Sequence, residues 1–316
     1  MNNNHSIEKA NIAWPFALLS NILIVLGFIL VANWAGGVCM YLYLGRIPTE
    51  SDFITADPDL ITLVKHTLLA GQIGGTLVGL VVLPLLYVFY LKRELKGVIF
   101  NSLNAQLLPF IGAGIGITFV ILPLIGIIGD WNKSITLPES WNSMEVIMRA
   151  MELKAEKMTK LIVYYHSLSE GIMVFFTVAL LPAIAEELVF RGILQNDLLK
   201  YTGNVHIAVF ISAAIFSFIH LQFFGFFPRL LLGIILGYLY ITSGNIIVSI
   251  LMHFLNNAMV IVALNLYAQG TLKMDPESSK DLPKESVYLS ILLSSALFYL
   301  CWSMYKQRTN TERTNV

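Results

Sequence analysis

The sequence predicts an all-α fold, a polytopic membrane helical bundle of about eight transmembrane helices with an additional amphipathic helix. Three observations lead to this prediction. Of the 316 residues, 56% are hydrophobic and only 13% are charged, whereas soluble domains carry about 25% charged residues. The mean hydropathy is +0.72. Apolar stretches of membrane-spanning length also recur along the chain.

The composition also excludes several classes of protein. An intrinsically disordered chain needs low hydrophobicity, which this chain lacks. The 20 basic and 20 acidic residues cancel, so no net charge attracts nucleic acid. Cys39 and Cys301 lie far apart in apolar surroundings and form neither a disulfide framework nor a CxxC metal site.

Three spans are predicted in the first half of the chain. Residues 13–44 form the first, because this stretch is too long for a signal peptide and no clear cleavage site follows. An acidic loop around residues 50–59 precedes the second span, residues 68–91, where Gly71, Gly75 and Gly79 form a face for close helix packing. The third covers residues 107–129, and its glycines are interpreted as packing residues rather than a nucleotide loop.

Residues 139–160 have a different pattern, because apolar side chains recur every three or four positions between charged ones. Pairs such as Glu145–Arg149 and Glu156–Lys160 support a helix. This amphipathic helix is expected either to lie at the membrane surface or to pack as a lid over the bundle, and the pattern does not decide between them.

Five further spans are predicted, at residues 162–195, 205–222, 228–243, 246–267 and 287–305. The stretch from 161 to 195 is too long for one straight crossing, so it must tilt, kink at Pro182 or project into water. The positive-inside rule places the basic segments after the second, fourth and eighth spans on one side. Both termini are therefore expected to be cytoplasmic, in an integral membrane protein. These basic residues are Lys92, Arg93, Lys96, Arg191, Lys200, Lys306, Arg308 and Arg313.

Polar side chains inside the spans gather in the C-terminal half of the chain. A charge at the centre of a bilayer costs about 2.5–3.5 kcal/mol on insertion scales, so such groups indicate function. The first three spans hold almost none of them, which suggests an N-terminal scaffold and a C-terminal polar centre. The residues concerned are Glu186, Glu187, Arg191, His220, Arg229, His253, Asn256 and Asn257.

Helical spacing separates the two adjacent acids. Glu187 and Arg191 are four residues apart and share a helix face, so the arginine is expected to neutralise Glu187. Glu186 points about 100° away and is left to face a cavity. His253 and Asn257 are also four residues apart on one face of another helix.

These residue types are suited to hydrolysis. A carboxylate such as Glu186 in an apolar cavity can act as a general base, and His220 can help it hold a water molecule. His253 and Asn257 can donate hydrogen bonds to the oxyanion formed when water attacks an amide. A zinc site of Glu186, His220 and His253 remains the alternative, although no HExxH motif is present.

Three motifs resemble those of the CPBP intramembrane protease family, also called Abi or type II CAAX prenyl endopeptidase-like. They are EExxxR beginning at Glu186, FxxxH from Phe216 to His220, and HxxxN from His253 to Asn257. The resemblance covers about residues 175–262. It implies an eight-helix endopeptidase with a water-filled cavity open toward the cytoplasm.

The resemblance also implies a role for each motif residue. Glu186 and His220 would activate the water, and His253 with Asn257 would form the oxyanion hole. Structural support would come from Glu187, Arg191 and Phe216. No cofactor is expected, with zinc as the alternative. The expected partners are a membrane-anchored or lipidated protein or peptide substrate and the lipid bilayer, without nucleic acid.

The chain is accordingly interpreted as a single membrane domain, residues 1–316. Residues 1–160 form scaffold spans and the amphipathic helix, 161–270 the catalytic core, and 271–316 the last loop, span and cytoplasmic tail. Two other classes compete with a protease. A secondary transporter usually shows an internal repeat and polar groups in both halves. A non-catalytic scaffold or bacteriocin-immunity protein would not need all four candidate catalytic residues.

Overall fold

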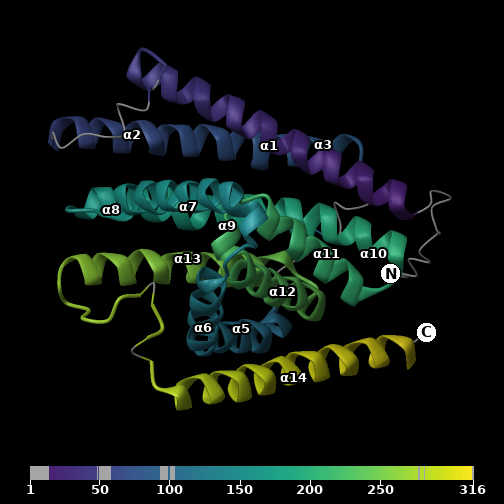
Figure 1. Ribbon diagram of the computed structural model, residues 1–316. Helices are drawn as coiled ribbons and strands as arrows, with labels where there is room; N and C mark the ends of the chain where they lie inside the picture. The colour runs from purple at the N-terminus through teal and green to yellow at the C-terminus, as the bar shows by residue number, and fades with distance from the viewer. Residues whose placement is uncertain are drawn as a thin grey trace.

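The computed structural model describes residues 14–47, 49, 58–92, 99, 104–276, 278–280 and 282–314. Within these ranges the chain is a bundle of helices without strands (Figure 1). Helices suit a lipid environment because each satisfies its own backbone hydrogen bonds. The α-helices are α1 Trp14–Leu44, α2 Pro58–Gly75, α3 Leu83–Tyr90, α5 Leu108–Val120, α6 Leu122–Ser134, α7 Asn142–Val163, α8 Leu168–Val174, α9 Leu181–Glu187, α10 Asn196–Thr202, α11 Val205–Phe218, α12 Phe226–Ser243, α13 Ile246–Ala268 and α14 Lys284–Thr314.

Several of these helices join into longer continuous ones through π-helical segments. Thr76–Val82 connects α2 to α3, while Phe175–Leu180 and Leu188–Gln195 flank α9. Short 3₁₀ turns occur at Ala105–Leu107, Glu139–Trp141 and Phe223–Gly225. The α9 segment therefore lies between two π-helical segments, a feature that is frequent at functional sites.

The membrane-bundle fold class is confirmed, with fewer full-length spans than expected. In the described ranges, six helical stretches are long and apolar enough to cross a membrane, and the bent pair Ala105–Val120 and Leu122–Ser134 makes up to seven. The remaining expected span, 205–222, contains only the shorter apolar helix Val205–Phe218. The full spans are Pro15–Leu44, Asp59–Tyr90, Leu168–Thr202, Phe223–Ser243, Ile246–Ala268 and Lys284–Gln307.

Three predicted spans differ from the structure for identifiable reasons. The second span begins at Asp59, about ten residues before the predicted start at 68. Lys65 can lie inside this helix because it is buried and donates to the Tyr164 carbonyl at 2.5 Å. The third span bends by 45° at Ile121, where Pro123 enters the first turn of α6 and lacks an N–H to continue the helix. The fourth begins at Leu168 rather than 162, because α7 extends to Val163 before the chain turns.

The glycine face predicted on the second span packs against α1. A Cβ on Gly75 would lie 2.6 Å from the Ala32 carbonyl oxygen, and one on Gly36 would lie 2.8 Å from that of Gly71. Side chains at these positions would therefore push the helices apart. In Figure 1, α1 to α3 form one outer layer, α14 lies on the opposite side, and the helices from α7 to α13 occupy the middle.

Helix α7 packs along the bundle, which favours the second of the two expected placements. It contacts α2, α13 and the turn Phe223–Gly225. On its inner face Glu152 is half-buried, together with Met148 and Ala155 of the predicted apolar stripe. Met144 and Met151 of the same stripe are exposed. Part of the apolar stripe therefore packs against the bundle, and the rest faces outward.

Candidate active site

The two adjacent acids lie at the end of α9 in different environments. The Glu187 side chain is 0% exposed and that of Arg191 is 1% exposed, and their Oε1 and Nη1 atoms are 2.6 Å apart. Arg191 also donates to the Gly233 carbonyl at 2.8 Å, which links this helix to α12. Glu186 keeps 19% of its side chain exposed. The expected ion pair of Glu187 with Arg191 is therefore present.

Glu187 has a second partner that the spacing argument missed. Its Oε1 atom accepts a hydrogen bond from Nδ1 of His253 at 2.8 Å. The carboxylate can only accept from this ring, so Nδ1 carries the proton and Nε2 points elsewhere. Nε2 lies 3.7 Å from Oε2 of Glu186. One histidine on α13 thus lies between the two acids of α9.

His220 follows the end of α11, and a hydrogen bond fixes the orientation of its imidazole ring. Its Nδ1 lies 2.8 Å from the carbonyl oxygen of Phe216. A carbonyl cannot donate, so Nδ1 is the protonated nitrogen and Nε2 of the neutral ring is an acceptor. The next residue, Leu221, has φ +54°, a left-handed conformation that L side chains rarely adopt. The chain therefore reverses sharply directly after His220.

Phe216 holds the two histidines apart and in place. Its ring packs edge-on against His220 at 5.1 Å and against His253 at 6.0 Å between centroids. The Arg191 guanidinium lies 5.2 Å from the centroid of the same ring. The FxxxH motif therefore provides both the carbonyl that orients His220 and an aromatic wall shared by the polar groups.

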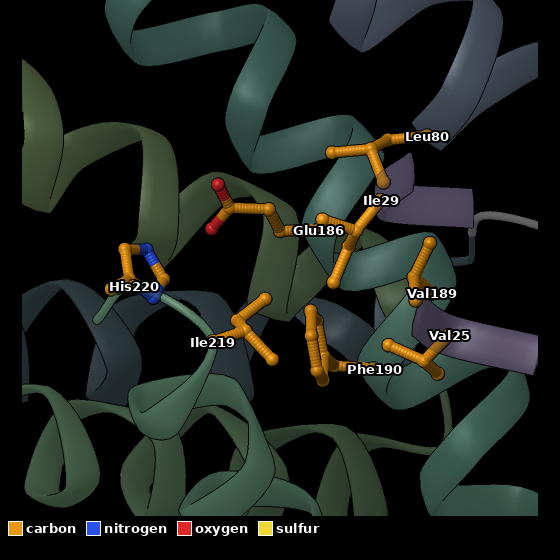
Figure 2. A pocket seen from close by; sticks show the side chains of 8 residues that line it. All are labelled: Val25, Ile29, Leu80, Glu186, Val189, Phe190, Ile219 and His220. Atoms are coloured by element: carbon orange, nitrogen blue, oxygen red, sulfur yellow. The ribbon is translucent and has the colours of Figure 1, made fainter. Parts of the chain in front are cut away.

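Glu186 and His220 line one small cavity of about 80 Å³. Figure 2 shows the Glu186 carboxylate extending toward the side where His220 lies, while most of the apolar side chains lie on the other side. The volume has room for water, which needs about 10–15 Å³ for its centre and polar partners nearby. The other lining residues are Val25, Ile29, Leu80, Val189, Phe190 and Ile219.

A larger apolar hollow of about 380 Å³ adjoins this cavity between α1 and α11. The two share Val25 and Ile219 in their walls. The other residues lining the hollow are Ile22, Leu26, Ala214, Ile215, Phe218 and Phe226.

Asn257 lies one helical turn after His253 and is half-buried. Its Oδ1 accepts from Nδ2 of Asn256 at 3.5 Å. Among the described side chains, no hydrogen bond joins Asn257 to Glu186, His220 or His253. The structure thus brings together Glu186, Glu187, His220 and His253, with Asn257 on the same face of α13 as His253.

Two further charged residues belong to this region. Arg229, which the sequence placed in a span without a role, lies within electrostatic range of Glu186 and of Glu152 on α7. One carboxylate oxygen of Glu152 is buried without a hydrogen-bond partner in the described part of the chain. The sequence offered little signal for Glu152, because its helix looks like an ordinary amphipathic one with several surface charges.

The alternative zinc ligands, Glu186, His220 and His253, have suitable donor atoms, but these atoms are not arranged around a common metal position in the described residues. In both histidines Nδ1 donates to a protein oxygen, and Nε2 is the nitrogen left for a metal ion, as is common in metal-binding histidines. Across the described residues, however, no group of three His, Cys, Asp or Glu side chains is arranged to hold a metal ion.

Residues 168–259 match the model of the protein family described as type II CAAX prenyl endopeptidase Rce1-like. The matched segment contains all three motifs and confirms the resemblance to the CPBP family. It implies a protease and supports intramembrane endopeptidase activity in general terms. No curated protein and no solved structure matches the sequence.

Proposed function

We propose that this protein is an intramembrane endopeptidase that hydrolyses a peptide bond with a water molecule activated by Glu186 and His220. The observation that supports this most is that these two side chains line the same largely apolar cavity, with Nε2 of His220 left as an acceptor. A carboxylate and an imidazole around one water molecule are the elements of general base catalysis.

The proposed reaction has two steps, the addition of water and the release of the amine. Glu186 takes one proton from the water while the hydroxide oxygen bonds to the carbonyl carbon of the peptide. The carbonyl π-electrons move to oxygen, where His253 and Asn257 donate hydrogen bonds to the resulting anion. The oxyanion electrons then re-form the carbonyl bond while the carbon–nitrogen bond breaks and Glu186 returns the proton to the leaving amine. Because Nδ1–H of His253 is donated to Glu187, donation from its Nε2 requires the imidazolium form, whose charge faces both acids.

We infer a membrane-anchored or lipidated substrate. The apolar hollow of about 380 Å³ shares two wall residues with the catalytic cavity. An apolar part of the substrate seated there would bring the adjoining peptide bond to Glu186. We also propose that both termini are cytoplasmic, because Lys92 follows α3 and Lys306 lies at the end of the span Lys284–Gln307, where the positive-inside rule expects basic residues on the cytoplasmic side.

The direct test is hydrolysis by the purified protein in detergent or proteoliposomes. Peptides of one sequence, with and without a prenyl or acyl chain, would be incubated with it, and the products identified by mass spectrometry. Cleavage at one internal peptide bond, faster for the lipidated peptide, is expected. Intact peptides of both kinds would contradict the proposal and favour a non-catalytic scaffold.

A zinc-dependent form of the same protease is the second candidate. It is favoured by the Nε2 atoms of His220 and His253, which the hydrogen bonds of Nδ1 leave available as ligands. We expect active protein without stoichiometric transition metal, and activity that survives chelators, since Glu186 and His220 can activate the water themselves. Elemental analysis together with chelation tests this expectation. About one zinc per chain, with activity lost on chelation and restored by zinc, would instead assign Glu186, His220 and His253 as ligands.

A further inference from the structure

The loop directly after His220 is held from several sides. Asn132 of α6 accepts from the Phe227 amide at 3.0 Å and donates to the Phe223 carbonyl at 3.1 Å. Ser217 donates to the Phe226 carbonyl at 2.6 Å. These contacts fix the part of the loop that leads into α12. They do not reach Gln222, which is closer to His220 in the chain.

Arg229 holds this nearer part of the loop. It reaches back from the first turn of α12 and donates from Nη1 to the Gln222 backbone carbonyl at 3.2 Å. Its Nη2 donates to the Gln222 side-chain oxygen. The planar guanidinium therefore grips one residue at two oxygens, an arrangement that a lysine cannot reproduce.

Gly225 leaves room for this grip. A Cβ on Gly225 would lie 2.6 Å from Nη2 and 3.0 Å from Cζ of Arg229. The backbone of Gly225 has φ −114° and ψ 9°, which an alanine can adopt. Alanine at this position would thus move the guanidinium while leaving the arginine and the backbone path in place.

The clamp formed by Arg229 and Gln222 also lies within electrostatic range of the candidate base. The charges of Glu186 and Glu152 both act on Arg229. Its hydrogen bonds in the described structure go instead to the neutral oxygens of Gln222. The guanidinium is thus held within electrostatic range of Glu186 by two neutral oxygens.

We propose that Arg229 is a positioning residue that, through Gln222 and the reversal at Leu221, sets the orientation of His220 toward Glu186. The role in catalysis rests on the proposed function, whereas the role in orienting His220 does not. A displacement of about 1 Å at a reacting group can lower a rate by about 10²-fold. Loss of the clamp should therefore act on kcat far more than on KM.

The experiment compares Arg229→Lys and Gly225→Ala with the wild-type protein. Both variants are expected to lower kcat by about 10–100-fold with KM within about 3-fold. Gly129→Ala is the matched glycine control, because its Cβ would meet only Pro228 at an ordinary 3.7 Å. Lys92→Arg is the control for exchanging one half-buried cation for another elsewhere, at its ion pair with Asp197. Neither control should change kcat by more than about 2-fold in folded protein.

The second readout is the NMR signal of the His220 ring, identified by its loss in His220→Gln. In the wild type it should report the Nδ1–H tautomer fixed by Phe216. In Arg229→Lys and Gly225→Ala it should shift or broaden, while both controls keep the wild-type signal. A wild-type His220 signal in both test variants would overturn the proposal. If the wild type hydrolyses no peptide, the proposed function fails, and the NMR comparison still decides whether Arg229 positions His220.

Discussion

Glu187 and His253 are joined by a hydrogen bond of 2.8 Å between Oε1 and Nδ1. The same oxygen is 2.6 Å from Nη1 of Arg191. The second acid of the EExxxR motif therefore has two tasks. It neutralises a buried arginine, and it fixes the ring of the histidine that lies next to Glu186.

This arrangement predicts that Glu187→Gln is severely destabilising. Removing one partner of a buried ion pair leaves an uncompensated charge and typically costs about 3–5 kcal/mol. Arg191 is 1% exposed, so its charge has no access to solvent. Thermal unfolding in detergent measures the effect, with Glu186→Gln as the matched variant one residue away. Similar melting temperatures for Glu187→Gln and the wild type would contradict the account.

The oxyanion hole predicts a contrast between two adjacent asparagines. Asn257→Ala should lower kcat by about 10²–10³-fold with little change in KM, the scale for loss of one oxyanion donor. Asn256 points about 100° away. Its contact with Asn257 is a weak hydrogen bond of 3.5 Å, so Asn256→Ala should be much milder. Steady-state kinetics of the two variants checks this, and the reverse order of damage would remove Asn257 from the site.

The start of α7 should respond to acid. The Leu137 amide and the Arg149 side chain donate to Glu145 and hold the pKa of its carboxyl below the usual range. A lowered folded-state pKa gives stability that is present above the unfolded value, about 4.3, and is lost as the pH falls through the folded one.

Hydrogen exchange of the Leu137 amide measures this contact, with Glu145→Ala as the reference at each pH. The wild type should show greater protection at pH 7, and the difference should vanish on strong acidification. Glu139→Ala is the control, since this residue precedes α7 in the turn Glu139–Trp141. Equal exchange in the wild type and Glu145→Ala at neutral pH would show that the contact does not hold the segment.

The fold class and the Glu187–Arg191 pair were predictable because both depend on local periodicity. Apolar stretches of span length identify the bundle, and a four-residue spacing places Glu187 and Arg191 on one helix face. The length of the second span was not predictable from hydropathy. Lys65 looks like a polar boundary in the sequence, and only the fold supplies the Tyr164 carbonyl and Glu170 that satisfy it.

The sequence motifs supplied the members of the candidate site, but not the contacts between them. The motifs named Glu186, Glu187, His220 and His253. The bond from His253 to Glu187 joins residues 66 positions apart, so it depends on how α9 and α13 pack. The same is true of Glu152, whose proximity to Arg229 arises because α7 lies against the turn Phe223–Gly225.

The measurement that tests the central claim most directly is kcat/KM for peptide hydrolysis by the wild type and by Glu186→Gln. The glutamine keeps the size of the side chain but cannot take a proton from water. The account predicts a loss of about 10²–10⁴-fold, the contribution of a general base, with an unchanged melting temperature. Glu156→Gln, which removes a partly exposed carboxylate paired with Lys160 on α7, should keep wild-type activity. Equal hydrolysis by the wild type and Glu186→Gln would contradict the assignment of Glu186 as the base.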